Sequence, residues 1–329
     1  MKQCLLVFAV AFVLSSLEPR YLCSEPPAWE LVKAVGAPTA RHEASFVACR
    51  DQLFLIGGRR INPVDVFDPR NATWMRRVET PMEMHHFQAV SIGSKIYIVG
   101  AMTGPYPRET PLEKVVVFDT ETSSFDFVHH IPETRRRGGA GVVVHQDKIY
   151  LVGGITNGHL DGTVSWFDCY DPQTGHWDAL EDAPHARDHC TAAIAEGRLY
   201  ALAGRRTNAA SKKTFQLTEP AVDVFDFNTN RWLPEQTVPD LPTPRAGNMA
   251  TSYRGRIYVG GGESGTQKAA HDEVDIFDPK KGIWESGPAL VTGRHGSGFA
   301  IVDDVMYTAA GSANRGGGPE QDSIERLRL

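Results

Sequence analysis

Short apolar runs separated by turn residues recur along the chain with a period of about 50 residues. One type of run starts with an aromatic residue, continues with two mostly apolar residues and ends with two small ones, as in Phe54–Gly58. Its six copies begin at Phe54, Tyr97, Tyr150, Tyr200, Tyr258 and Tyr307. A fixed period of this length predicts a repeat architecture in which each copy is one supersecondary unit.

A second type of run ends in an aspartate, and a large aromatic residue follows six positions later. The pairs are Asp68 and Trp74, Asp119 and Phe125, Asp171 and Trp177, Asp226 and Trp232, and Asp278 and Trp284. The constant spacing indicates one hairpin geometry, because aspartate stabilises tight turns. Together with a small-residue run before each anchor, such as residues 139–144, each period holds four short strands, which predicts antiparallel sheet.

The recurring Gly pairs, tyrosines and tryptophans resemble the kelch repeat, the four-stranded blade of a β-propeller, over roughly residues 26–329. Two features depart from the pattern: three copies carry Gly-Ala or Ala-Gly in place of Gly-Gly, and Phe125 replaces one tryptophan. The resemblance implies an all-β, six-bladed propeller with four antiparallel strands per blade, and a scaffold that serves interactions.

The last copy lacks its tryptophan strand, since residues 323–329 fit a third strand and the sequence stops there. Trp29 stands 25 residues before Phe54, and the other outer aromatics precede the next anchor by 23 to 26 residues. We therefore expect the N-terminal strand around Trp29 to close the last blade, because closure covers sheet edges that would otherwise stay unpaired.

The chain opens with Lys2 and a mostly apolar stretch up to Leu17, which is typical of a secretory signal. Cleavage is expected after Ser16 or after Ser24, so we take residues 1–24 as signal peptide and 25–329 as propeller. An uncleaved anchor is the alternative. The pattern predicts a secreted or periplasmic protein.

Composition limits the partners. The 329 residues carry a formal net charge of −6, whereas a general nucleic-acid binder needs a basic footprint, so we expect no nucleic acid. No other stretch is long and apolar enough for a membrane span, and we expect a monomer. Cys49, Cys169 and Cys190 remain after signal removal, and their apolar surroundings predict buried free thiols.

Arginine stands 13 residues before the anchor in five of six copies, with Met84 as the exception. These arginines are Arg41, Arg137, Arg187, Arg245 and Arg294. The offset places them at the start of each innermost strand, near one mouth of the central channel. The guanidinium fork suits carboxylates and phosphates, so we expect an anionic ligand at this arginine-lined face. The alternative is a structural role, in which they bond backbone carbonyls or third-strand aspartates.

The residues beside these arginines differ between blades, which is typical of a binding site on a repeat scaffold. His189 and His295 are candidates there, and the loops after the Gly pairs add Arg205 and Glu263. The histidines raise the question of a metal. However, His185 and His189 lie in a loop rather than on a helix, and no paired acidic ligand accompanies them, so we expect no metal and no cofactor.

No complete catalytic motif is visible, so the sequence favours a binding module for a protein segment or a glycan, without catalysis. Sialic-acid mutarotases are the alternative, as similar secreted six-bladed propellers; Glu263 with Arg187 or Arg294 would then hold and protonate an acidic sugar. A cytoplasmic ubiquitin-ligase adaptor is disfavoured, since a helical dimerisation domain does not fit before Trp29. Asn71 begins a glycosylation sequon, which matters only in a glycosylating host.

Overall fold

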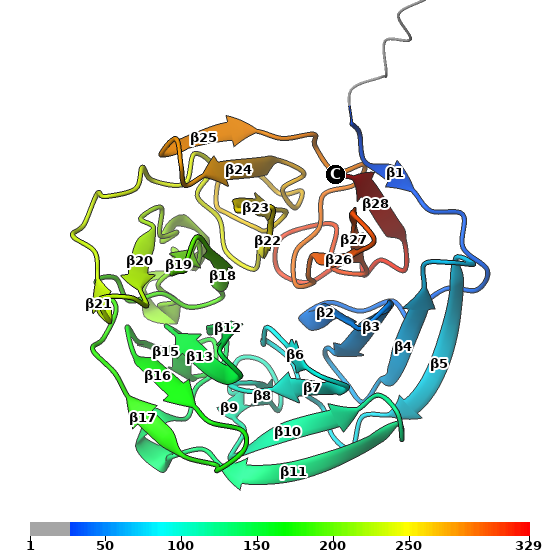
Figure 1. The fold of residues 1–329 in the computed structure, drawn as a ribbon, viewed down its shortest axis with the longest axis horizontal. Coiled ribbons are helices and arrows are strands. Elements are labelled where there is room, and N and C mark those ends of the chain that lie inside the picture. Colours follow the sequence, from blue (N-terminus) through cyan, green and yellow to red (C-terminus); the bar gives the residue numbers. More distant parts are fainter. Residues whose placement is uncertain (1–26) are drawn as a thin grey trace, which may run out of the picture.

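The computed structural model describes residues 27–329, so the expected signal segment lies outside the described residues. Six four-stranded antiparallel sheets surround a central axis, as Figure 1 shows, and this confirms the predicted all-β, six-bladed propeller. Within residues 27–329, no helix has the length and apolar character needed to cross a membrane. Cys49, Cys169 and Cys190 are buried free thiols, as expected.

The strands of the first three blades are given from the innermost outward. Blade 1 contains β2 (Ala44–Cys49), β3 (Gln52–Gly57), β4 (Pro63–Asp68) and β5 (Thr73–Glu79). Blade 2 contains β6 (Val90–Ile92), β7 (Lys95–Ile98), β10 (Lys114–Asp119) and β11 (Ser124–His130). Blade 3 contains β12 (Gly141–His145), β13 (Lys148–Val152), β16 (Phe167–Tyr170) and β17 (Trp177–Ala179).

The remaining blades follow the same order. Blade 4 contains β18 (Thr191–Ala195), β19 (Arg198–Leu202), β20 (Asp223–Asp226) and β21 (Arg231–Trp232). Blade 5 contains β22 (Met249–Tyr253), β23 (Arg256–Gly260), β24 (Val274–Asp278) and β25 (Ile283–Ser286). Blade 6 contains β26 (Ala300–Val302), β27 (Val305–Ala309), β28 (Ile324–Arg328) and β1 (Glu30–Leu31).

Short elements decorate the loops after the Gly pairs. Two ribbons lie there: β8 (Met102–Thr103) with β9 (Thr110–Pro111) in blade 2, and β14 (Ile155–Asn157) with β15 (Asp161–Thr163) in blade 3. Two single-turn 3-10 helices, Ala209–Ser211 and Thr214–Gln216, lie in the corresponding loop of blade 4, and a third, Glu133–Arg135, lies in the connection from blade 2 to blade 3. These segments differ between blades, so they give one face of the ring an irregular surface.

The turn aspartates explain the constant spacing of six residues. In blade 1, Asp68 Oδ1 accepts a hydrogen bond from the Arg70 backbone N–H at 3.0 Å, and the same contact recurs after Asp119, Asp171, Asp226 and Asp278. This bond fixes the hairpin so that Phe67 pairs with Trp74 across β4 and β5. The outer aromatic therefore always lies against the residue that precedes the turn aspartate.

Blade 6 takes its outermost strand from the N-terminal part of the chain. In β1, Glu30 pairs with Arg326 and Leu31 with Glu325 of β28, and the Val32 N–H donates to the Ile324 carbonyl at 3.0 Å. Figure 1 shows this strand beside the C-terminus. Trp29 is 6% exposed and stacks on Phe299 with ring centroids 5.4 Å apart. The last blade is therefore held by residues from both ends of the described chain.

Six apolar clusters lie between neighbouring blades, and each contains one outer-strand aromatic residue. These aromatics are Trp29, Trp74, Phe125, Trp177, Trp232 and Trp284. Trp74 packs on Phe46 and Phe67, and its cluster extends to Tyr307 of blade 6. Trp166 lies outside the repeat position and stacks under the Arg135 guanidinium, 4.6 Å from the ring centroid. Asn71 is exposed in the β4–β5 turn.

Candidate functional site

The five repeated arginines point into their own blades rather than into the channel. Each is at most 1% exposed. Arg187, for example, donates to the Ala221 carbonyl at 2.8 Å and to Asp223 Oδ2 at 2.9 Å. The carboxylate partner lies on the third strand or its edge in every case, namely Asp65, Asp168, Asp223, Asp275 and Glu325. Each arginine thus ties the entry to the inner strand to the third strand of the same sheet.

This placement differs from the expected ring of guanidinium groups at the channel mouth. Burial removes these side chains from a ligand, and each guanidinium already donates to carbonyl and carboxylate oxygens of its own blade, although one or two nitrogens of Arg187, Arg245 and Arg294 have no partner. For Arg41, burial is the main cause that lowers the pKa to about 10, although Asp65 opposes it, and the group stays charged at neutral pH. The candidate site therefore does not include these arginines, namely Arg41, Arg137, Arg187, Arg245 and Arg294.

In each blade, the residue directly after the arginine position lies opposite the residue directly after the Gly pair, and the two backbones are hydrogen-bonded there. Asp188 bridges to Arg205 in blade 4, and Ala246 bridges to Glu263 in blade 5. The preceding glycines make the close approach possible. Gly204 has φ +98°, and a Cβ there would lie 2.8 Å from the Asp188 carbonyl oxygen. This pairing brings Arg205 and Glu263 to the channel.

The second residue after each arginine position forms a belt of backbone hydrogen bonds around the channel. The belt residues are Glu43, His86, Gly139, His189, Gly247 and Gly296. Each blade donates to the preceding one, as in His86 N–H to the Glu43 carbonyl at 3.1 Å and Gly247 N–H to the His189 carbonyl at 2.8 Å. At the two junctions that reach Gly139 and Gly296, the donor is the residue after the belt position, Cys190 or Ala44. All six have positive φ, between 50° and 67°. Three blades use glycine there, whereas three carry a side chain at a conformational cost.

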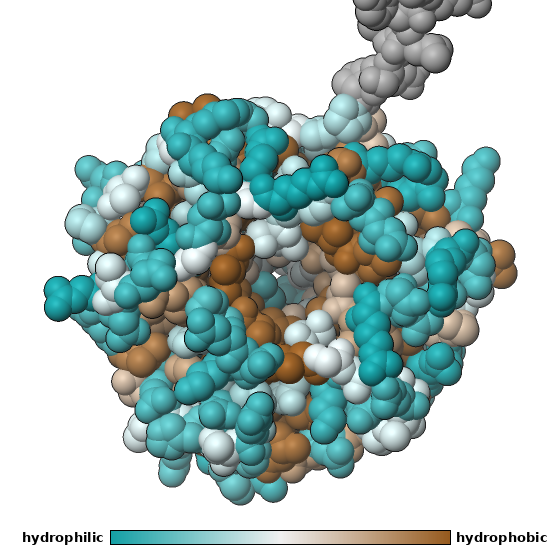
Figure 2. Space-filling model, viewed as in Figure 1, coloured by the Kyte–Doolittle hydropathy of each residue, from teal (hydrophilic) through white to brown (hydrophobic). Residues whose placement is uncertain are grey.

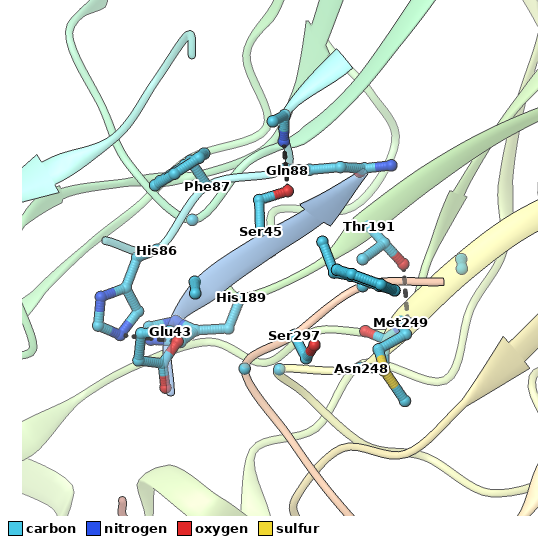
Figure 3. Close-up of a pocket in the computed structure, with 18 of the residues that line it drawn as sticks. Glu43, Ser45, His86, Phe87, Gln88, His189, Thr191, Asn248, Met249 and Ser297 are labelled. Carbon is cyan, nitrogen blue, oxygen red and sulfur yellow. Dashed lines mark hydrogen bonds and ion pairs between the residues drawn. The ribbon is translucent and has the colours of Figure 1, made fainter. Parts of the chain in front are cut away.

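Inside the belt, the channel is narrow and polar. Figure 3 shows Ser45, Gln88, Thr191, Asn248 and Ser297 around a cavity of about 90 Å³. These side chains bridge blades: Gln88 Oε1 accepts from the Val142 and Ala192 N–H groups, both at 3.0 Å, and Asn248 Nδ2 donates to Thr191 Oγ1 at 2.7 Å. Beyond them the lining becomes apolar, and Figure 2 shows apolar residues gathered at the edge of the central opening.

On the other side of the belt lies a cavity of about 300 Å³, which we call the channel mouth. Its wall includes Arg205, Glu263 and His295 from the candidates expected from the sequence, and His189 lies in the belt beneath it. The mouth also includes residues that were not among the candidate site residues, namely His42, Glu43, Arg59, His86, Tyr106, His159, Lys212 and Phe215. Four of these residues, Tyr106, His159, Lys212 and Phe215, come from loops without a fixed repeat offset, whereas the other four stand at repeat positions.

Arg205 and Glu263 form a buried ion pair in the mouth, at 2% and 3% exposure. The Gly316 N–H donates to Glu263 Oε2 at 2.7 Å, and His295 Nε2 lies 3.6 Å from the same oxygen. Burial alone would raise the pKa of Glu263, but His295, Arg205 and the Gly316 amide outweigh it and bring the pKa to about 2. Glu263 is therefore ionised at neutral pH and cannot donate a proton.

Three histidines meet where the mouth reaches the belt. The ring centroids of His86, His159 and His189 are 4.8 to 4.9 Å apart, and one potential ligand atom from each lies within 4.8 Å of the others. We call this group the three-histidine cluster. His185 does not join it, because its Nδ1 lies 2.7 Å from Asp223.

Comparison with known proteins supports the repeat assignment. A family model described as the KLHDC2/KLHL20/DRC7 Kelch-repeats domain matches residues 86–311. Kelch-like protein terF of Aspergillus terreus is 28% identical over 294 residues, covering 84% of this chain and 60% of that protein. Kelch-like protein 25 of Xenopus tropicalis is 25% identical over 267 residues, covering 78% of this chain and 42% of that protein. The chain therefore spans less than two thirds of the length of these curated relatives.

A solved structure, "Structure of YjhT", has a TM-score of 0.70 with this fold at 15% sequence identity, covering 90% of this chain and 99% of that one. At this identity the likeness concerns the fold alone. The family match, the six-bladed ring and the repeated Gly pairs, turn aspartates and outer aromatics lead to one conclusion: the chain belongs to the kelch-repeat β-propeller family.

Proposed function

We propose that this propeller is a secreted binding module that holds an acidic segment of a partner protein at the channel mouth. Kelch propellers serve as protein-binding scaffolds, and the irregular loops on a rigid ring are where recognition is expected to reside. The ligand class and secretion are parts of the proposal.

The observation that carries the proposal is the position of Tyr106. Its side chain belongs to the turn between β8 and β9, is 69% exposed and lines the mouth beside His159, with ring centroids 5.1 Å apart. Exposed tyrosines at the rim of a cavity are typical anchors of protein interfaces, because the ring offers apolar area and the hydroxyl a hydrogen bond. Phe215 supplies a second aromatic side chain in the same cavity.

One exposed cation of the mouth, Lys212, favours a negatively charged segment. Arg205 is paired with Glu263, and Arg59 donates to Glu109 at 2.6 Å, so both are neutralised inside the protein. Lys212 is exposed in the same cavity, and within residues 27–329 it forms no ion pair. A partner carboxylate would complement this lysine, mainly by speeding association and setting specificity.

Mutarotase-like catalysis has less support. Arg187 and Arg294, the expected anion-holding groups, are buried within their blades. Glu263 is ionised and hydrogen-bonded to Arg205, so it is not available as a general acid. An acidic sugar is therefore kept as a comparison ligand in the binding test.

Tyr106→Ala is expected to weaken peptide binding at least tenfold, because loss of an interface anchor costs more than about 1.4 kcal/mol. The probe is a displayed library of random peptides selected against the wild-type protein, with N-acetylneuraminic acid assayed in parallel. We expect selected peptides rich in Asp and Glu, and a weaker salt dependence of their binding in Lys212→Ala. Ile283→Ala, at an exposed apolar position on β25, is the control and should change nothing.

Selected peptides that bind Tyr106→Ala and wild type equally would contradict this location of the site. Binding of the sugar in place of any peptide would contradict the protein-ligand proposal and favour the alternative.

Secretion has its own test. The protein expressed from its full reading frame should appear outside the cytoplasm with a new N-terminus after Ser16 or Ser24. N-terminal sequencing of the recovered protein decides this, and an intact Met1 on a protein retained in the cytoplasm would overturn it.

A further inference from the structure

The three-histidine cluster is built from three adjacent blades. His86 and His189 occupy equivalent belt positions in blades 2 and 4, and Gly139 stands between them in blade 3. Blade 3 contributes through its loop instead: His159 lies in the turn between β14 and β15, where its N–H donates to the Pro107 carbonyl at 3.0 Å. Figure 3 shows His86 and His189 close together beside Glu43 at one end of the channel cavity.

The distances within the cluster suit a bound cation. His159 Nε2 and His189 Nε2 are 3.1 Å apart. Two imidazole nitrogens that bind one tetrahedral zinc ion, each at 2.0–2.1 Å, are about 3.3 Å apart. Small rotations of the rings would therefore bring both nitrogens to ligand distance, and the His86 ring lies edge-on to both at 4.8 Å.

Carboxylates lie behind the rings of His159 and His189, whereas His86 has a neighbour at both nitrogens: Nε2 faces Glu43, and Nδ1 lies 2.5 Å from His85 Nδ1, a contact that His86 exchanges for the metal. His189 Nδ1 lies 2.6 Å from Asp188 Oδ1, His159 Nδ1 lies 2.9 Å from Glu109 Oε1, and His86 Nε2 lies 3.3 Å from Glu43 Oε2. With its Nδ1 directed at Asp188, His189 turns Nε2 toward His159 Nε2, and a cation between these two nitrogens would replace their direct contact. Carboxylate–histidine–metal arrangements of this kind are common in metal sites.

The ionisation states agree with this arrangement. Burial raises the pKa of Asp188 and of Glu109, but for each the adjacent histidine and arginine outweigh burial and bring the pKa to about 2, so both carboxylates can accept protons in hydrogen bonds. Burial lowers the pKa of His86 well below its ordinary value. The pKa of His189 is also lowered, mainly by burial and secondly by the positive charge of Arg205. Both rings are neutral at pH 7, which is the form that binds metals.

The backbone gives an independent reason to assign a function to these residues. Glu43, His86 and His189 have φ of 56°, 54° and 50°, whereas glycine takes the same belt position in the other three blades. A side chain in this left-handed conformation costs roughly 1–2 kcal/mol, and such strain clusters at functional sites. Packing alone does not require it, because glycine forms the same belt hydrogen bonds in blades 3, 5 and 6.

We propose that His86, His159 and His189 bind one divalent first-row transition metal, such as Zn²⁺, with Asp188, Glu109 and Glu43 orienting the rings. Three imidazoles are a ligand set that zinc and its neighbours accept. His86 and His159 also line the channel mouth, so a further coordination position faces that cavity and is open to water or to a ligand carboxylate. The proposal does not depend on the identity of any partner.

The test titrates the chelator-treated, purified protein with Zn²⁺ by calorimetry and with Co²⁺ by visible absorption. We expect one ion per chain with a dissociation constant in the micromolar range or below, and the absorption of four- or five-coordinate cobalt. His159→Ala should weaken binding at least 100-fold. Glu109→Gln should weaken it 10- to 100-fold through ring orientation. His176→Ala, which removes an exposed histidine between β16 and β17, should leave binding unchanged.

His189→Gly separates a metal role from a structural one. Glycine suits the left-handed backbone, so the melting temperature of the metal-free variant should fall by no more than a few degrees from that of wild type. The variant should nevertheless lose Zn²⁺ binding. Zn²⁺ should also raise the melting temperature of wild type but not of the variant. Millimolar or absent binding by wild type, or equal binding by wild type and His159→Ala, would overturn the proposal.

Discussion

Arg294→Ala is expected to lower the free energy of unfolding by about 3–5 kcal/mol, because it leaves a buried charge without its partner. Arg294 and Glu325 are both 0% exposed, and the guanidinium also donates to the Ala310 carbonyl at 2.8 Å. After the substitution Glu325 keeps only the Val291 and Thr292 N–H groups as hydrogen-bond donors. Urea unfolding monitored by tryptophan fluorescence measures the change.

Arg326→Ala is the matched control, because Arg326 lies on β28 next to Glu325. Its ion pair with Glu30 is partly exposed on both sides, and such pairs contribute about 0–1 kcal/mol. Peptide binding at the channel mouth should be unaffected in Arg294→Ala molecules that remain folded. Unchanged stability together with lost binding would show that the repeated arginines serve the ligand after all, contrary to their burial.

A chain that begins at residue 38, without β1 and Trp29, is expected to aggregate or to unfold at a much lower temperature than wild type. The truncation unpairs the edge of β28 and exposes Phe299, which stacks on Trp29. Trp29→Ala alone should cost about 3–5 kcal/mol, the range for truncating a buried tryptophan. Thermal unfolding and size-exclusion chromatography report both effects.

A chain that begins at residue 27 is the control, because it keeps the β1–β28 pairing. It should melt like the longer protein. If the chain that begins at residue 38 gave the same melting curve and remained monomeric, β1 would contribute little and blade 6 would be stable with three strands.

The fold could be predicted because its signals are local and repeated. A turn aspartate accepts a hydrogen bond from the backbone N–H two residues further along the chain, and this bond fixes the hairpin. The six-residue spacing between Asp68 and Trp74 therefore recurs in the other copies. The Gly pairs mark where the backbone approaches the neighbouring segment too closely for a side chain, as at Gly204. Each signal depends on a few adjacent residues, which is why the sequence reveals it.

The site was harder to predict, because a repeated residue and a functional residue look alike in one sequence. Arginine at one offset in five blades reflects an ion pair that each blade makes with its own third strand, as between Arg245 and Asp275. The positions that differ between blades carry more information: His86 and His189 replace the glycine found in three other copies. Tyr106 and His159 come from unrepeated loops, and only the folded ring brings them together.

The β1–β28 pairing also dictates an order of events when the protein is made. Glu30 and Arg326 are separated by 296 residues, so β1 finds its partner only after all the intervening blades and β28 have been synthesised. Five blades can form from contiguous sequence, whereas the sixth must wait with β28 unpaired. During that interval the open edge can pair with another nascent chain, so yield should depend on expression rate and temperature more than the stability of the finished ring suggests.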